Sequence, residues 1–104
     1  MKNNDWIEIE LYYDNHCYET EVLRCYIKPE EIVFSEHTSE HAPGDSYGLS
    51  YVLTSQNMQK FISCIKEEEI DLEETIKRKF SGATGVEKFK AICMLNQIEY
   101  RIYL

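Results

Sequence analysis

The sequence predicts an α+β fold, in which an antiparallel sheet of N-terminal strands plus a C-terminal strand carries about three helices packed on one face. The first observation is that residues 6–53 are rich in alternating apolar and polar side chains, as strands are. The second is that residues 54–97 repeat apolar side chains at the three- and four-residue spacing of helices. Residues 98–104 alternate again and predict a last strand that joins the first sheet, with one side formed by Ile98, Tyr100, Ile102 and Leu104.

Four strands are expected in the N-terminal half, at residues 6–13, 18–27, 31–35 and 47–53. The first strand places Ile7, Ile9, Leu11 and Tyr13 on one face and Trp6, Glu8, Glu10 and Tyr12 on the other. Turn-forming residues at 14–16 separate the first two strands, and Pro29 interrupts the second. We expect a polar loop at residues 36–46, with a turn at residues 43–45.

Each of the three expected helices begins at a residue able to cap it. The candidate caps are Thr54 or Ser55, Asp71 with Glu74, and Thr84 with Glu87. The apolar faces comprise Met58, Phe61, Ile62 and Ile65, then Leu72, Ile76 and Phe80, then Val86, Phe89, Ile92 and Cys93. Gly82 is a stop signal after the second helix, and Asn96 with Gln97 ends the third.

The 104 residues, 43% of them apolar, suit one domain over 1–104, with a strand-rich half at 1–53 and a helix-rich half at 54–104. The formal net charge of −8 falls entirely in the first half, because the second half holds as many bases as acids. This charge disfavours direct nucleic-acid binding and favours a basic protein partner. The N-terminus lacks the apolar region of a signal peptide, and no apolar run approaches the roughly 18 residues of a membrane span, so we expect a cytoplasmic protein with no membrane role.

The first hairpin supplies the candidate partner-binding residues. If the turn lies at Asn15 and His16, Tyr12 faces Glu19 and Glu10 faces Glu21. The outward face then carries Glu8, Glu10, Glu19 and Glu21, bordered by Trp6 and Tyr12. Opposed carboxylates cost a hairpin a few tenths of a kcal/mol, so their retention favours a role in binding a basic partner. The alternative is the hydrated face of an amphipathic sheet, where charges prevent aggregation.

The segment from His37 to His41 matches H-x-x-E-H, the zinc-binding pattern of the inverzincin metallopeptidases. That chemistry needs two histidines one helical turn apart, a general base and a further metal ligand. The segment has no apolar face to hold a helix against a core, and Pro43 and Gly44 follow it. We therefore expect a hydrated loop and neither a metal nor a cofactor.

Two further features have structural interpretations. Cys17, Cys25, Cys64 and Cys93 form no C-x-x-C pair, so we expect them to act as small core residues. The basic run at residues 77–79 is interleaved with acidic residues and is typical of the hydrated face of a helix.

A small, acidic α+β chain without a catalytic motif, whose hairpin carries Glu8, Glu10, Glu19 and Glu21, resembles the anti-CRISPR proteins of phages and mobile elements. The resemblance implies a non-enzymatic inhibitor that covers a basic nucleic-acid-binding surface of a larger protein, such as a CRISPR-associated nuclease, and blocks nucleic-acid or guide engagement. Its partner-binding residues would be Trp6, Glu8, Glu10, Tyr12, Glu19 and Glu21. One alternative is an immunity or antitoxin protein that neutralises a toxin. A second is a small metal-dependent enzyme using His37, Glu40 and His41.

Overall fold

The computed structural model describes residues 6–15, 19–40 and 46–104. In chain order the elements are β1 (Ile7–Asn15), β2 (Glu19–Ile27), β3 (Glu31–Glu40), β4 (Ser46–Thr54), α1 (Ser55–Ile65), α2 (Leu72–Phe80), α3 (Gly85–Leu95) and β5 (Arg101–Tyr103). The five strands form one antiparallel sheet in the order β1-β2-β3-β4-β5, so the last strand joins the sheet at its edge, beside β4. The expected α+β architecture is confirmed. In the described ranges, no helix is long and apolar enough to cross a membrane.

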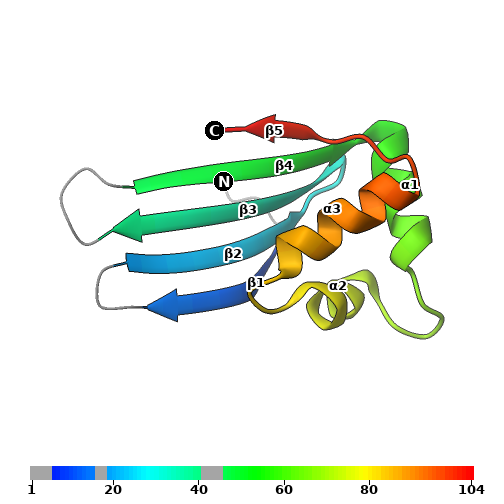
Figure 1. Ribbon diagram of the computed structural model, residues 1–104. Helices are drawn as coiled ribbons and strands as arrows, with labels where there is room; N and C mark the ends of the chain where they lie inside the picture. The colour runs from blue at the N-terminus through cyan, green and yellow to red at the C-terminus, as the bar shows by residue number, and fades with distance from the viewer. Residues whose placement is uncertain (1–5, 16–18, 41–45) are drawn as a thin grey trace.

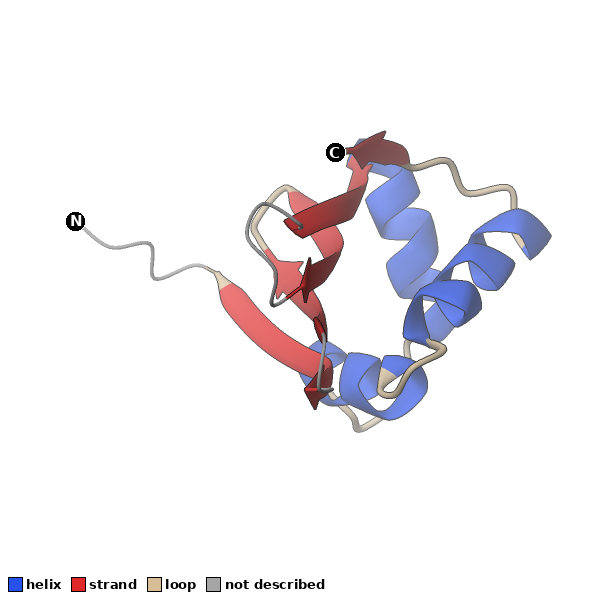
Figure 2. Cartoon of the chain, turned by 60° about the vertical axis from the view of Figure 1, so that its left-hand side comes forward, coloured by secondary structure: helices blue, strands red, loops and turns tan. Residues whose placement is uncertain are grey.

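The helices cover one face of the sheet and leave the other open (Figures 1 and 2). Phe34 of β3 holds the two layers together, because its ring meets one phenylalanine from each helix. The ring centroids lie 5.9 Å from Phe61 of α1, 5.3 Å from Phe80 of α2 and 4.5 Å from Phe89 of α3. All four side chains are fully buried. The sheet is curved, and the hairpin ends of β1–β4 extend beyond the helices (Figure 1).

The helix boundaries follow their caps closely. Asp71 precedes α2, and its carboxylate accepts a hydrogen bond from the Glu74 backbone N–H at 2.8 Å. Thr54 and Thr84 occupy the corresponding positions before α1 and α3, without a side-chain cap bond. The expected stop after α2 is also present: Gly82 adopts φ +107°, a conformation that side chains other than glycine rarely adopt. Its N–H then donates to the carbonyl of Leu11, which ties the α2–α3 turn to β1.

Two expectations about the strands are wrong. The third strand does not stop at residue 35 but continues to Glu40, so residues 36–40 belong to the sheet. The expected turn at residues 43–45 lies outside the described residues. In β1, a bulge between Glu10 and Tyr12 breaks the alternation. Ile9 and Leu11 are buried as expected, whereas Tyr12 packs against the core and Tyr13 is 55% exposed.

Candidate functional site

The pairing of β1 with β2 differs from the expected one. Glu10 lies opposite Arg24 and not Glu21, and Tyr12 lies opposite Leu23 and not Glu19. Two causes combine: the strand continues to Asn15, which moves the hairpin connection, and the bulge adds a residue to β1. The four glutamates of the expected binding face therefore divide between the two faces of the sheet.

Glu8 and Glu10 lie on the open face, together with Trp6. The Arg24 guanidinium is 3.4 Å from a carboxylate oxygen of Glu8 and 4.0 Å from one of Glu10. The Lys28 ammonium lies 4.0 Å from the centroid of the Trp6 ring and 3.2 Å from a carboxylate oxygen of Glu31. Glu8, Glu10 and Glu31 therefore each have a cation nearby. This arrangement suits the hydrated face of an antiparallel sheet.

Glu19 and Glu21 lie on the helix side of the sheet, because they alternate with the buried residues Leu23 and Cys25. Asp14 lies directly opposite Glu21, and Glu36 lies directly opposite Leu23. These four acids lie on the helix side of β1–β3, and Glu21 and Glu36 border a small pocket against Gly82 and Val86. We call this group the distal acidic surface: Asp14, Glu19, Glu21 and Glu36.

Two tyrosines connect the distal acidic surface to the core. The buried hydroxyl of Tyr51 donates to Glu36 Oε2 at 2.6 Å, and the hydroxyl of Tyr12 donates to Asp14 Oδ2 at 3.2 Å. Desolvation, and then the bond to Glu36, raises the pKa of Tyr51 above its usual range. Desolvation and Asp14 raise the pKa of Tyr12 in the same way. Both phenols therefore stay protonated as donors, and they hold two of the four carboxylates in fixed positions.

Buried protonated groups make the stability of the fold sensitive to alkaline pH. Desolvation raises the pKa of Cys25 above its usual range, while desolvation and the nearby Cys64 raise that of Cys93 to about 11. Each folded thiol holds its proton more tightly than the unfolded thiol does. Its contribution to stability is therefore complete below the unfolded value of 9.0 and is lost as the pH rises toward the folded value.

We expect the free energy of unfolding to fall above about pH 9, with a slope of up to about 1.4 kcal/mol per pH unit for each thiol. Urea denaturation at a series of pH values measures this slope. The double variant Cys25→Ala, Cys93→Ala is the control, and its slope between about pH 9 and 10 should be clearly smaller. An equal slope in the two proteins would contradict the assignment.

The histidine segment does not form the expected loop. His37 lies within β3, opposite Val22 of β2 and Gly48 of β4, and Glu40 is the last residue of that strand. His41 lies outside the described residues. Residues 37–40 form an extended strand and not a helix, so the helical geometry of the metallopeptidase pattern is missing. Among the residues described, no group of three His, Cys, Asp or Glu side chains could hold a metal ion.

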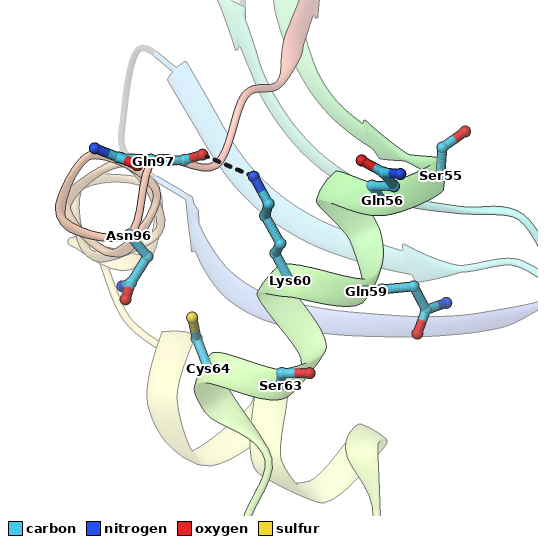
Figure 3. Close-up of a pocket in the computed structure, with 8 residues that line it drawn as sticks. All are labelled: Ser55, Gln56, Gln59, Lys60, Ser63, Cys64, Asn96 and Gln97. Atoms are coloured by element: carbon cyan, nitrogen blue, oxygen red, sulfur yellow. Dashed lines mark hydrogen bonds between the residues drawn. The ribbon is translucent and has the colours of Figure 1, made fainter.

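The cysteines only partly behave as expected. Cys25 and Cys93 are buried in the core, whereas Cys64 is exposed on α1. Cys17 lies outside the described residues. Cys64 borders a shallow groove between α1 and the end of α3, lined by Ser55, Gln56, Gln59, Lys60, Ser63, Cys64, Asn96 and Gln97. Lys60 reaches across it to the Gln97 carbonyl at 3.4 Å, while Gln59 and Ser63 point away from Gln97 (Figure 3).

Sequence reasoning missed Asp14 and Glu36. One signal could have indicated Asp14: the consecutive large side chains of Leu11, Tyr12 and Tyr13 cannot all obey strict alternation, which is typical of a bulge. A bulge there transfers Asp14 to the helix side. Glu36 has no such signal, because the polar residues around it predict a loop. Comparisons with protein-family models, with curated proteins and with solved structures found no match to this chain.

Proposed function

We propose that this protein is a non-enzymatic inhibitor that binds a basic, nucleic-acid-binding surface of a larger protein, of which a CRISPR-associated nuclease is our first candidate. The inhibitor covers the surface that would otherwise hold DNA or guide RNA. Binding is carried by the distal acidic surface, which replaces the hairpin face expected from the sequence.

The observation that carries this proposal is the concentration of carboxylates on the sheet. Arg24 is the only lysine or arginine within β1–β4, and it lies beside Glu8 and Glu10. The distal acidic surface lies further along the same strands, towards the hairpin ends. All four side chains are partly exposed, and Glu21 and Glu36 border a small pocket against Gly82 and Val86. A negative surface of this kind attracts a basic channel and steers the encounter with it.

A second support is the direct opposition of Asp14 and Glu21 across the hairpin. Like charges at this spacing are destabilising by a few tenths of a kcal/mol. A bound basic surface would reverse the sign of that contribution, because its lysines and arginines would lie near both carboxylates. Binding would therefore relieve the repulsion between these two carboxylates.

The test is inhibition of DNA binding by purified, guide-loaded CRISPR-associated nucleases, measured by the mobility of labelled target DNA. We expect the protein to displace DNA from at least one nuclease, and less so at high salt. The triple variant Asp14→Asn, Glu19→Gln, Glu21→Gln should weaken inhibition at least tenfold. Glu36 is kept because Tyr51 bonds to it.

The matched control is the open-face variant Glu8→Gln, Glu10→Gln, which also removes negative charge but on the other face. It should inhibit nearly as well as the unchanged protein. The triple variant should remain folded in urea denaturation, because each amide keeps an oxygen that accepts hydrogen bonds. Inhibition that depends on Glu8 and Glu10 alone would refute our choice of surface. DNA binding unaffected in every nuclease would refute the choice of partner, and capture of a toxin would then favour an antitoxin.

A further inference from the structure

The two edges of the sheet differ in how they are protected. At the β1 edge, the bulge interrupts the strand, the Leu11 carbonyl already accepts a bond from Gly82, and Glu8, Glu10 and Asp14 add negative charge. Bulges and charges are the usual protection against pairing between sheets. The β5 edge carries one charged residue, Arg101, and is flanked by apolar side chains. Its outer side presents backbone groups to which a further strand could bond.

Large apolar side chains are exposed at this edge. Ile102 is 55% exposed, Tyr103 is 51% exposed and Leu104 is fully exposed. Tyr100, which directly precedes β5, contributes to a groove on the helix side that is also lined by Glu87, Lys90, Ala91, Met94 and Ile98. Met94 is itself 76% exposed. Exposed apolar surface that adjoins an open strand edge is typical of an interaction surface.

We propose that this edge pairs with the β5 edge of a second copy of the chain, forming a two-fold dimer with a continuous sheet. Antiparallel pairing centred on Ile102 places Ile102 opposite its own counterpart, Arg101 opposite Tyr103 and Tyr100 opposite Leu104. No like charges face each other in this register, and Arg101 lies beside an aromatic ring. The interface is self-complementary, as two-fold symmetry requires.

On the helix side of the sheet, the same register places apolar side chains of one copy next to the groove of the other. Ile102 lies opposite Tyr51, whose side chain is buried under the helices, so Ile102 and Leu104 point towards the helix side. The Leu104 side chain of one copy therefore lies opposite Tyr100 of the other and next to the groove beside Met94. A strand of three residues cannot supply the roughly 800 Å² per partner of a standard interface, so these side chains must add to it.

Charge also favours a second copy at this place. Residues 85–104 contain Glu87 and Glu99 against three bases, so this part of an acidic chain is slightly positive. Two copies meet here with little repulsion. Antiparallel pairing directs the two hairpin ends in opposite directions, which separates the distal acidic surfaces by far more than the Debye length of about 8 Å at physiological salt.

The first test is the mass of the unchanged protein by sedimentation equilibrium over a range of micromolar concentrations. We expect a concentration-dependent rise toward twice the chain mass of 12.3 kDa. Leu104→Lys should raise the dissociation constant at least tenfold, and its exposed position should leave the fold intact. Tyr13→Lys at the β1 edge is the matched control and should leave the dimer unchanged. A monomer at every concentration overturns the proposal, as does a dimer lost only with Tyr13→Lys.

The second test fixes the register. In a background with Cys17→Ser and Cys64→Ser, the variant Ile102→Cys should form a disulfide-linked dimer under mild oxidation. Directly opposed residues have Cα atoms about 4.5–5.5 Å apart, within the range a disulfide spans. Tyr103→Cys should cross-link much less, because each copy's residue 103 lies opposite residue 101. Faster cross-linking through position 103 than through position 102 overturns the register.

Discussion

Replacing Phe34 by alanine should lower the free energy of unfolding by about 3–5 kcal/mol, as removal of a fully buried aromatic ring commonly does. This is the largest stability effect we expect from a single substitution. The ring lies within 6 Å of three other phenylalanine rings, one from each helix. Its loss leaves a cavity between the sheet and all three helices, because a strand residue cannot shift to refill it without breaking its pairs with Cys25 and Tyr51.

Urea denaturation followed by far-ultraviolet circular dichroism measures this loss. Phe34→Leu is the second variant, which should remain folded at a cost of about 1–2 kcal/mol if the alanine variant does not fold. Tyr13→Ala, an exposed aromatic of the same sheet, is the control and should cost less than about 1 kcal/mol. A loss below about 1 kcal/mol for Phe34→Ala would contradict the central place of this ring in the core.

The second large effect concerns Gly85, the first residue of α3. An alanine elsewhere in a helix is more favourable than glycine by about 1 kcal/mol. Here the added methyl group would clash with the backbone carbonyl of Phe80 and lie 2.7 Å from Cδ2 of Leu23. The start of α3 would have to move away from α2 and β2. We therefore expect Gly85→Ala to lower the free energy of unfolding by about 1–3 kcal/mol.

The control is the neighbouring Thr84→Ala. Thr84 occupies the cap position but makes no side-chain cap bond, so this change should cost no more than about 0.5 kcal/mol. Thermal and urea unfolding of both variants give the comparison. A Gly85→Ala variant as stable as the unchanged protein would show that α3 does not need this close approach.

The helices could be predicted well because their signals are local. The Asp71 cap and the apolar faces around Phe61 and Phe89 depend on residues within one or two helical turns, and each is found as predicted. The ion pairs of Glu73 with Lys77 and Glu74 with Arg78, which follow from the same four-residue spacing, are also present.

The strands could be predicted only in part. Residues 36–40 predict a loop because all five are polar, so no apolar alternation marks this part of β3. The register of β1 with β2 depends on a bulge that the fold fixes from a distance, since the Leu11 carbonyl bonds to Gly82. Nothing near Glu10 in the sequence indicates Arg24 as its neighbour. Because β1 pairs with β2 in a different register from the expected one, the candidate binding residues differ as well.

The most direct measurement is carbodiimide cross-linking of the protein to the inhibited nuclease, followed by mass spectrometry of the linked peptides. This chemistry joins a carboxylate to a lysine in contact with it and adds no spacer. The proposed function predicts links from Asp14, Glu19 or Glu21 to lysines of the nuclease's nucleic-acid channel. Links confined to Glu8 and Glu10, or to the acids at residues 67–69 between α1 and α2, would contradict it.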